Sequence, residues 1–232
     1  MALTVAQRRM LAIGLVPLLV LVVTGAAVTV SIIRGKLPYD YSASFVPGAQ
    51  GVQIVSDSHT QLLASADGQV HVAVDGSYAV EQPAINITTT NGLLHVQAKC
   101  PDTHCEMDLT VEVPSQSAVQ VEAEGESVDV VRVASPLAID VSDGSVTTNR
   151  LRSRQVSADV RRGSIDLNFE SPPDQVTAKA SDGSLTVQLP RNVTYAFDAV
   201  PSQGSNDLEL PSDPASPRHV VLRTNYGSIT VH

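Results

Sequence analysis

Residues 139–148 read Ile139-Asp-Val-Ser-Asp-Gly-Ser-Val-Thr-Thr148, in which apolar and polar residues alternate on both sides of a glycine. Alternation with a period of two places apolar side chains on one face and polar side chains on the other, which is typical of a half-buried β-strand. A glycine between two such stretches allows the backbone to bend sharply. This stretch therefore predicts two short strands joined by a glycine turn.

The same pattern recurs along the second half of the chain. Glycines follow one another at intervals of 19, 19, 20, 21 and 23 residues, and four of them precede Ser, an apolar residue and a polar residue. A nearly fixed period of about 20 residues indicates stacked repeats. We therefore expect one turn per repeat, marked by Gly125, Gly144, Gly163, Gly183, Gly204 and Gly227.

The sequence predicts an all-β domain over residues 51–232, because nothing after residue 40 sustains a helical period. A β-solenoid-like stack of these repeats is favoured by the regular period. A β-sandwich built from hairpins remains the alternative. The segment before this domain, residues 34–50, contains Pro38, Pro47 and Gly48 and is assigned to a stalk or linker.

An apolar stretch lies near the amino terminus. Residues 10–33 contain no charged side chain, and 24 residues are enough to cross a hydrocarbon core of about 30 Å as a helix. We therefore predict a transmembrane helix at 10–33 and a cytoplasmic segment at 1–9. A cleaved signal peptide is the alternative, since Gly25-Ala-Ala27 offers small residues for a cleavage site.

The chain has two cysteines, Cys100 and Cys105, and their close spacing suits a small disulfide loop. Disulfides persist outside the reducing cytosol, so this pair favours an extracytoplasmic domain. Two unrelated thiols or a metal pair are the alternatives. A structural zinc site needs four ligands, and only His104 lies beside these two cysteines.

The charge of the predicted domain disfavours nucleic acid as a partner. Four of the 15 basic residues precede Leu37, whereas all 24 acidic residues follow it, so the remainder carries a formal net charge of −13. Nucleic-acid binding depends on neutralising phosphates with a basic surface. Together with the apolar stretch and the cysteine pair, this charge predicts a single-pass protein of the cell membrane with an acidic extracytoplasmic domain.

Five arginines stand out against this acidic background, and all lie within 13 residues: Arg150, Arg152, Arg154, Arg161 and Arg162. One interpretation is a solvated corner with ion pairs to neighbouring carboxylates. The other is a site for anionic cell-wall polymers or lipid headgroups, since guanidinium groups bind phosphate and carboxylate in a bidentate fashion.

Motifs for catalysis, cofactors and metals are absent from the sequence. No nucleophile elbow, P-loop or H-E-x-x-H motif occurs, and the serines that follow the glycines recur with the turns. His71 and His95 could neighbour one another and bind a metal, and Asp143, Asp166, Asp182 and Asp207 recur near turns, but the calcium-binding repeat is missing. We expect no enzyme, no cofactor and no metal.

The sequence also resembles a known family. The residues that carry the likeness are Lys99-Cys-Pro-Asp-Thr-His-Cys105, then Leu109-Thr-Val-Glu-Val-Pro114, then the Asp/Arg-Gly-Ser repeats. Over about residues 50–232 this resembles the bacterial putative-adhesin family of β-strand-repeat domains, especially its membrane-anchored actinobacterial members. The resemblance implies an extracytoplasmic repeat domain with no established reaction. The irregular unit around Gly204 departs from the pattern.

These observations predict a non-catalytic binding or scaffolding role at the cell envelope, toward an anionic wall polymer or an envelope protein. The chain ends at Ile229-Thr-Val-His232, inside the repeat pattern. Either an earlier segment folds over this end or another chain pairs with it. The alternative function is therefore an accessory or sensor subunit that docks through an uncapped C-terminal strand edge. A polysaccharide-active solenoid enzyme is a third hypothesis.

Overall fold

The computed structural model describes residues 35–232, and every regular element in this range is a β-strand. This confirms the predicted all-β class. The predicted membrane span at 10–33 and the cytoplasmic segment at 1–9 lie outside the described residues. Within residues 35–232, no helix has the length and apolar character that crossing a membrane requires.

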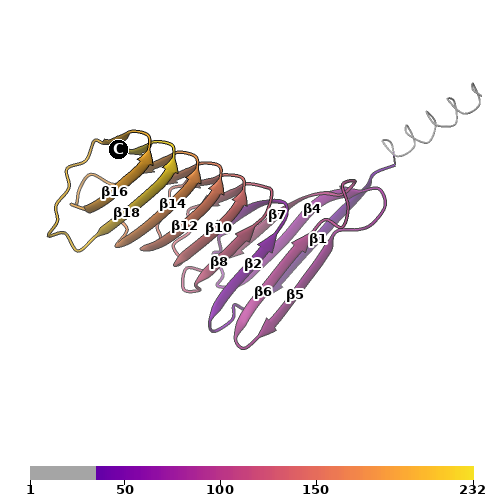
Figure 1. Ribbon diagram of the computed structural model, residues 1–232. Coiled ribbons are helices and arrows are strands. Elements are labelled where there is room, and N and C mark those ends of the chain that lie inside the picture. The colour runs from indigo at the N-terminus through magenta and orange to yellow at the C-terminus, as the bar shows by residue number, and fades with distance from the viewer. Residues whose placement is uncertain (1–34) are drawn as a thin grey trace, which may run out of the picture.

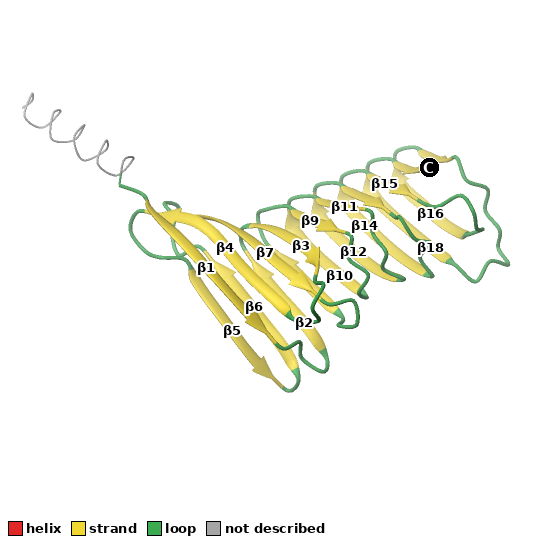
Figure 2. Cartoon of the chain, turned by 180° about the vertical axis from the view of Figure 1, so that it is seen from behind, coloured by secondary structure: helices red, strands yellow, loops and turns green. Residues whose placement is uncertain are grey.

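The strands form two mixed sheets that lie one over the other (Figures 1 and 2). The ten-stranded sheet has the order β1 (Leu37–Phe45), β4 (Val70–Tyr78), β7 (Glu106–Val113), β3 (His59–Ala64), β9 (Val128–Val131), β11 (Val146–Asn149), β13 (Ile165–Asn168), β15 (Leu185–Gln188), β19 (Ile229–Val231), β17 (Asn206–Leu208). The nine-stranded sheet has the order β16 (Ala196–Gln203), β18 (His219–Tyr226), β14 (Gln175–Asp182), β12 (Gln155–Arg162), β10 (Leu137–Asp143), β8 (Val119–Ala123), β2 (Gly51–Ser56), β6 (Leu93–Lys99), β5 (Ala84–Thr90).

From β8 onward, each repeat places its first strand in the nine-stranded sheet and its second strand in the ten-stranded sheet (Figure 1). Neighbouring repeats pair in parallel and in register, so that Ile139 lies beside Ala158, Ala158 beside Ala178, and Ala178 beside Leu222. All four side chains are buried. The predicted alternation therefore gives rows of core residues that run from one layer to the next.

The turn glycines also lie one above another. Gly144, Gly163, Gly183 and Gly227 have φ between 135° and 157°, a conformation that side-chain-bearing residues rarely adopt. A Cβ on Gly163, Gly183 or Gly227 would come within 1.9–2.1 Å of the carbonyl oxygen of the glycine in the preceding layer. Gly125 differs, because a Cβ there would meet nothing within 4 Å. The alignment is thus tight everywhere except at the first turn.

The order of the last two layers departs from the order of the chain. Strands β18 and β19 lie between β14/β15 on one side and β16/β17 on the other. The C-terminal strands are therefore not an uncapped edge, and the docking edge proposed for an accessory subunit is wrong. The irregular unit around Gly204 covers them instead, which is the arrangement in which an earlier segment folds over the chain end.

The first third of the described chain is less regular than the repeats. Strands β2 and β3 continue the parallel rows, but β1 pairs antiparallel with β4, β4 with β7, and β5 with β6. Residues 37–45, assigned above to the linker at 34–50, form the edge strand β1. The folded domain thus begins at Leu37 and not at residue 51.

Candidate anion-binding corner

The five arginines that the sequence groups together fall at two separate places. Arg150 and Arg152 follow β11, and Arg154 directly precedes β12, whereas Arg161 and Arg162 lie at the far end of β12. A strand of eight residues is about 25 Å long at roughly 3.3 Å per residue. The expected patch is therefore divided into two groups, one at each end of the strand.

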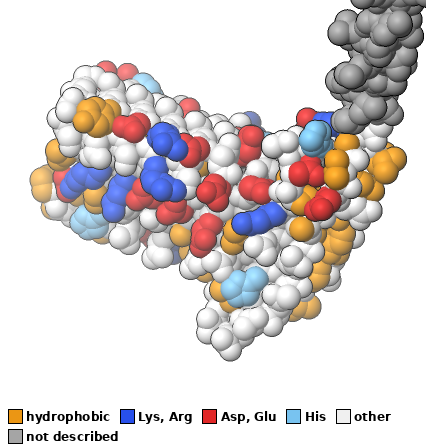
Figure 3. Space-filling model, turned by 45° about the vertical axis from the view of Figure 1, so that its right-hand side comes forward, with side chains coloured by type: hydrophobic (Ala, Val, Ile, Leu, Met, Phe, Trp, Pro, Cys, Tyr) orange, Lys and Arg blue, Asp and Glu red, His pale blue; other side chains and the backbone are white. Residues whose placement is uncertain are grey.

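Most of these arginines pair with carboxylates. Arg152 makes a bidentate contact with Glu170, at 2.9 and 3.1 Å, and Arg154 lies 2.7 Å from Asp174. Arg162 pairs with Asp143, and its hydrogen bonds hold the pKa of that carboxyl below the ordinary value. Basic and acidic side chains accordingly alternate over the layers seen in Figure 3. Such exposed pairs contribute little to stability, on the order of 0–1 kcal/mol each.

Two arginines, one of the five and one outside them, have no carboxylate partner of this kind in the described part of the chain. Arg132 and Arg150 are exposed and make no side-chain hydrogen bond or ion pair within residues 35–232. They follow neighbouring strands, and the backbone N–H of Arg132 donates to the carbonyl of Asn149 at 2.9 Å. Both have positive φ, at 55° and 54°, which is costly for a residue with a side chain.

Arg152 and the charges of these two residues all act on one carboxylate, that of Glu170. The pKa of Glu170 is lowered first by its hydrogen bonds from Arg152, and the nearby charges of Arg150 and Arg132 add to this effect. We call this group of Arg132, Arg150, Arg152 and Glu170 the arginine corner. The corner thus contains three guanidinium groups and one carboxylate, so it carries excess positive charge in an otherwise acidic domain.

A cavity of about 430 Å3 opens beside the arginine corner. Arg132 and Arg152 form part of its wall, Glu112 contributes one carboxylate, and the remaining lining is apolar or small: Leu63, Ala64, Ser65, Ala66 and Val131. Such a surface suits an anionic group carried on a carbon framework, because guanidinium groups bind phosphate or carboxylate while the apolar part covers carbon.

Arg132 was missed by the sequence analysis because it lies outside the run of arginines at 150–162. The signal that could have identified it is its position in the repeat. Arg132-Val133 and Arg150-Leu151 each follow a short strand one period apart, and Val131 pairs with Asn149 in register. Comparing equivalent positions between repeats, and not neighbouring positions along the chain, brings the two arginines together.

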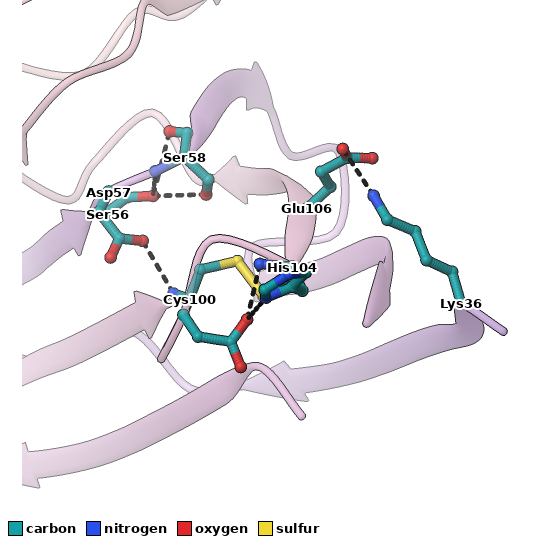
Figure 4. The surroundings of a disulfide bond; sticks show 9 residues. Lys36, Ser56, Asp57, Ser58, Cys100, His104 and Glu106 are labelled. Atoms are coloured by element: carbon teal, nitrogen blue, oxygen red, sulfur yellow. Dashed lines mark hydrogen bonds and ion pairs between the residues drawn. A yellow bond between two sulfur atoms is a disulfide. The ribbon is translucent and has the colours of Figure 1, made fainter. Parts of the chain in front are cut away.

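The predicted disulfide between Cys100 and Cys105 is present and closes the loop between β6 and β7 (Figure 4). The carboxylate of Asp57 accepts the backbone N–H of Cys100 at 3.0 Å. This contact ties the loop to the bend between β2 and β3.

A larger cavity of about 570 Å3 lies beside the disulfide and is strongly acidic, with the carboxylates of Asp57, Asp75, Glu106, Asp108 and Glu126 in its lining. Carboxylates on the wall of a cavity repel anions, so the two cavities differ in the ligands they suit. The structure describes no group of three His, Cys, Asp or Glu side chains within residues 35–232 that could hold a metal ion.

The hypothesis that His71 and His95 are neighbours is wrong, because they lie on strands of different sheets. His71 instead has its Nε2 atom 2.9 Å from both carboxylate oxygens of Asp67.

Comparison with known proteins gives the fold a context. No protein-family model and no curated protein matches the sequence. A crystal structure of a putative cell adhesion protein from Clostridium sporogenes is similar with a TM-score of 0.51 and 11% identity, over 84% of this chain and 99% of that chain. A putative adhesin from Bacteroides fragilis is similar with a TM-score of 0.48 and 14% identity, over 84% and 97% of the two chains. The chain thus shares its overall fold with the putative cell adhesion protein from Clostridium sporogenes.

Proposed function

We propose that this protein is a membrane-anchored, extracytoplasmic binding domain of the cell envelope that has no catalytic role. Support comes from the uncharged stretch at 10–33, from the disulfide between Cys100 and Cys105, and from the fold shared with adhesins. In this proposal residues 1–9 are cytoplasmic and the domain from Leu37 onward lies outside the cytoplasmic membrane.

The layered part of the domain, from β8 to β19, serves in this proposal as a short β-solenoid. Its backbone layers repeat every 4.8 Å or so, so side chains at equivalent corner positions are presented at the same interval. A polymer with regularly spaced charges can contact several such positions at once. This geometry suits binding to an extended chain better than binding to a single small molecule.

The proposed ligand is an anionic envelope polymer, with phosphate or carboxylate groups, bound at the arginine corner. The observation that carries this assignment is the pair Arg132 and Arg150, which are exposed, adjacent in the stack and without an anionic partner of their own. A polymer phosphate or carboxylate would supply that partner. The neighbouring cavity has room for the carbon framework that carries the charge.

Binding of a glycerol-phosphate polymer and of a uronic-acid polymer to the purified domain tests this proposal. Replacing both residues, as Arg132→Gln with Arg150→Gln, is expected to weaken binding by about a hundredfold or more, because each lost charge-assisted hydrogen bond contributes about 1.5–3 kcal/mol. The affinity should also fall as salt is added.

The matched control replaces Arg154 and Arg162 by Gln, since both are paired arginines outside the corner. This control variant changes the net charge by the same amount as the corner variant, but its affinity for the polymer should stay close to that of the unmodified domain. Equal losses in the two double variants would indicate a nonspecific charge effect, and unchanged binding in the corner variant would exclude the assignment.

A further inference from the structure

The end of the domain where the described chain begins carries an exposed apolar surface, lined by Leu37, Tyr39, Tyr78, Val80 and Ile85, which we call the apolar mouth. Strand β1 is the last strand of the ten-stranded sheet at this end, and β5 is the last strand of the nine-stranded sheet. Their inward-facing residues, among them Tyr39 and Ile85, pack on the core but are only partly buried, because no further strand within residues 35–232 covers them. Hydrophobic side chains gather there in Figure 3.

Leu37, the first residue of β1, and Val80, which follows β4, are exposed over 54% and 68% of their surface. Leu37 pairs with Tyr78 across β1 and β4, and the ring of Tyr78 packs edge-on against Tyr39 with centroids 6.4 Å apart. Val80 follows two residues after Tyr78. Two aliphatic and two aromatic side chains therefore cluster at one end of the two sheets.

The chain leaves little distance between this mouth and the apolar stretch. Only Arg34, Gly35 and Lys36 separate Ile33 from Leu37, and Leu37 is already held in the sheet by Tyr78. Four residue steps span at most about 14 Å when fully extended. The headgroup region adds only about 5–8 Å on each side of the hydrocarbon core. Without a longer linker, the domain cannot be held far from the bilayer.

From this geometry we infer that the mouth lined by Leu37, Tyr39, Tyr78, Val80 and Ile85 docks on the lipid bilayer, in its interfacial region. This inference rests on the anchoring in the proposed function. Aromatic and aliphatic side chains are favoured at the membrane–water interface, where each ring has apolar and polar surroundings. The domain then lies directly on the membrane, with its layered part directed away from the end that contacts lipid.

The contact is apolar and not electrostatic. Lys36, directly before Leu37, is paired with Glu106 at 2.6 Å, and the acidic cavity opens on this end of the domain (Figure 4). The exposed apolar side chains thus carry the contact, and docking should occur on phosphatidylcholine vesicles without a requirement for phosphatidylglycerol.

The chain contains no tryptophan, so a single introduced indole reports on one position. The full chain is reconstituted in vesicles as Leu37→Trp or Val80→Trp, and fluorescence quenching by lipids brominated on their acyl chains is measured. Both variants should show a blue-shifted emission and quenching at least about twofold stronger than the control, since the indole enters the interface. The control is Val200→Trp, which replaces a valine of similar exposure, 51%, on the edge strand at the opposite end.

The outcomes separate the two proposals. Quenching at positions 37 and 80 no stronger than at position 200, in protein that co-sediments with the vesicles, would overturn docking and leave the anchor intact. Failure of the full chain to incorporate into vesicles would overturn both. Thermal unfolding of each variant, compared with the unmodified chain, shows whether the exposed substitution leaves the fold unchanged.

Discussion

A Cβ atom placed on Gly163 would lie 1.9 Å from the carbonyl oxygen of Gly144, in the layer next to it. The two glycines belong to successive repeats, and β10 and β12, the strands that lead into them, pair in parallel. The atom that the Cβ would meet belongs to the backbone, so no side-chain rearrangement can relieve the clash. The glycine at each turn is thus required both by its own φ and by its neighbour's backbone.

The first prediction concerns this contact. Gly163→Ala should destabilise the domain by at least about 3 kcal/mol, because it adds a backbone clash to the strain of a positive φ. Gly125→Ala is the matched control, since Gly125 has a φ of 87° but open space around its Cβ position. Its cost should be only about 1–2 kcal/mol. Denaturant unfolding measures both, and equal costs would contradict the stacked arrangement of the glycines.

The disulfide gives a second prediction. Replacing Cys100 and Cys105 together by Ser should lower the free energy of unfolding by about 2 kcal/mol, the value expected for a very short closed loop. The measurement is denaturant unfolding of the variant beside the oxidised and the reduced unmodified domain. The reduced domain should match the variant. Equal stability of the oxidised domain and the variant would show that the bridge does not stabilise the fold.

The turn at Asp67 predicts a dependence of stability on pH. The carboxylate of Asp67 accepts the backbone N–H of Gln69 and the hydroxyl of Ser65 and is hydrogen-bonded to the ring Nε2 of His71, and these contacts lower its pKa from 3.8 to about 2. A carboxyl group whose pKa is lower in the folded than in the unfolded state stabilises the folded state at pH values above its unfolded-state pKa. This stabilisation is lost as the pH falls through its folded-state pKa. The stability of the unmodified domain should therefore decrease between pH ~4 and ~2.

The variant Asp67→Asn should lose this part of the pH dependence, as measured by unfolding midpoints over the same range. Ser65→Ala removes one of the smaller contributions and should have a weaker effect. Identical pH profiles for Asp67→Asn and the unmodified domain would show that the carboxylate contacts do not contribute.

The edge strand β16 carries a further prediction. Three of its outward backbone positions are unavailable for pairing: the N–H of Phe197 donates to the Oγ of Ser212, the carbonyl of Ala199 accepts from the Nδ2 of Asn206, and Pro201 has no N–H. An unblocked edge strand can pair with another chain. The combination of Pro201→Val with Ser212→Ala should therefore cause concentration-dependent association, measured by light scattering. A variant that keeps the same oligomeric state as the unmodified domain at every concentration would show that these residues do not prevent edge-strand pairing.

Part of the fold could be predicted from the sequence because it depends on local patterns. Alternation as in β12 fixes which side chains face the core, and the glycine period fixes where the chain bends. The positions of Gly144, Gly163 and Gly183 in one column follow directly from these two patterns. The five-residue spacing of Cys100 and Cys105 also suited the small loop that the structure contains.

The order of the layers could not be obtained from periodicity, because the units at 196–208 and 219–231 both consist of a strand, a glycine turn and a strand. Pro201 is the residue that distinguishes them. A central parallel strand needs every backbone N–H for pairing, so proline is confined to edge strands. The antiparallel pairing of β1 with β4 and of β5 with β6 was not predicted for a related reason, since short alternating strands do not specify their partners.

The arginine corner could be predicted only in part. Arg150 and Arg152 were identified as candidates from the local run of arginines, whereas Arg132 joins them only through the register of β9 with β11. The ion pairs of Arg154 and Arg162 depend on carboxylates about one repeat away in the chain. Local composition therefore gave the residue type, and the stacking of the repeats decides which side chains are left to bind a ligand.

The stacking of the repeats, on which this account depends, is tested most directly by engineered cysteines on the outer face of the nine-stranded sheet. Thr177 lies beside Val221, and Val221 lies beside Asp198. Thr177→Cys with Val221→Cys should form a disulfide on mild oxidation, because neighbouring backbones are about 4.8 Å apart and disulfides need roughly 4.4–6.8 Å. Thr177→Cys with Asp198→Cys, two layers apart at about 9.6 Å, should stay reduced. The reverse result would show that the layers follow the chain order and would contradict the account.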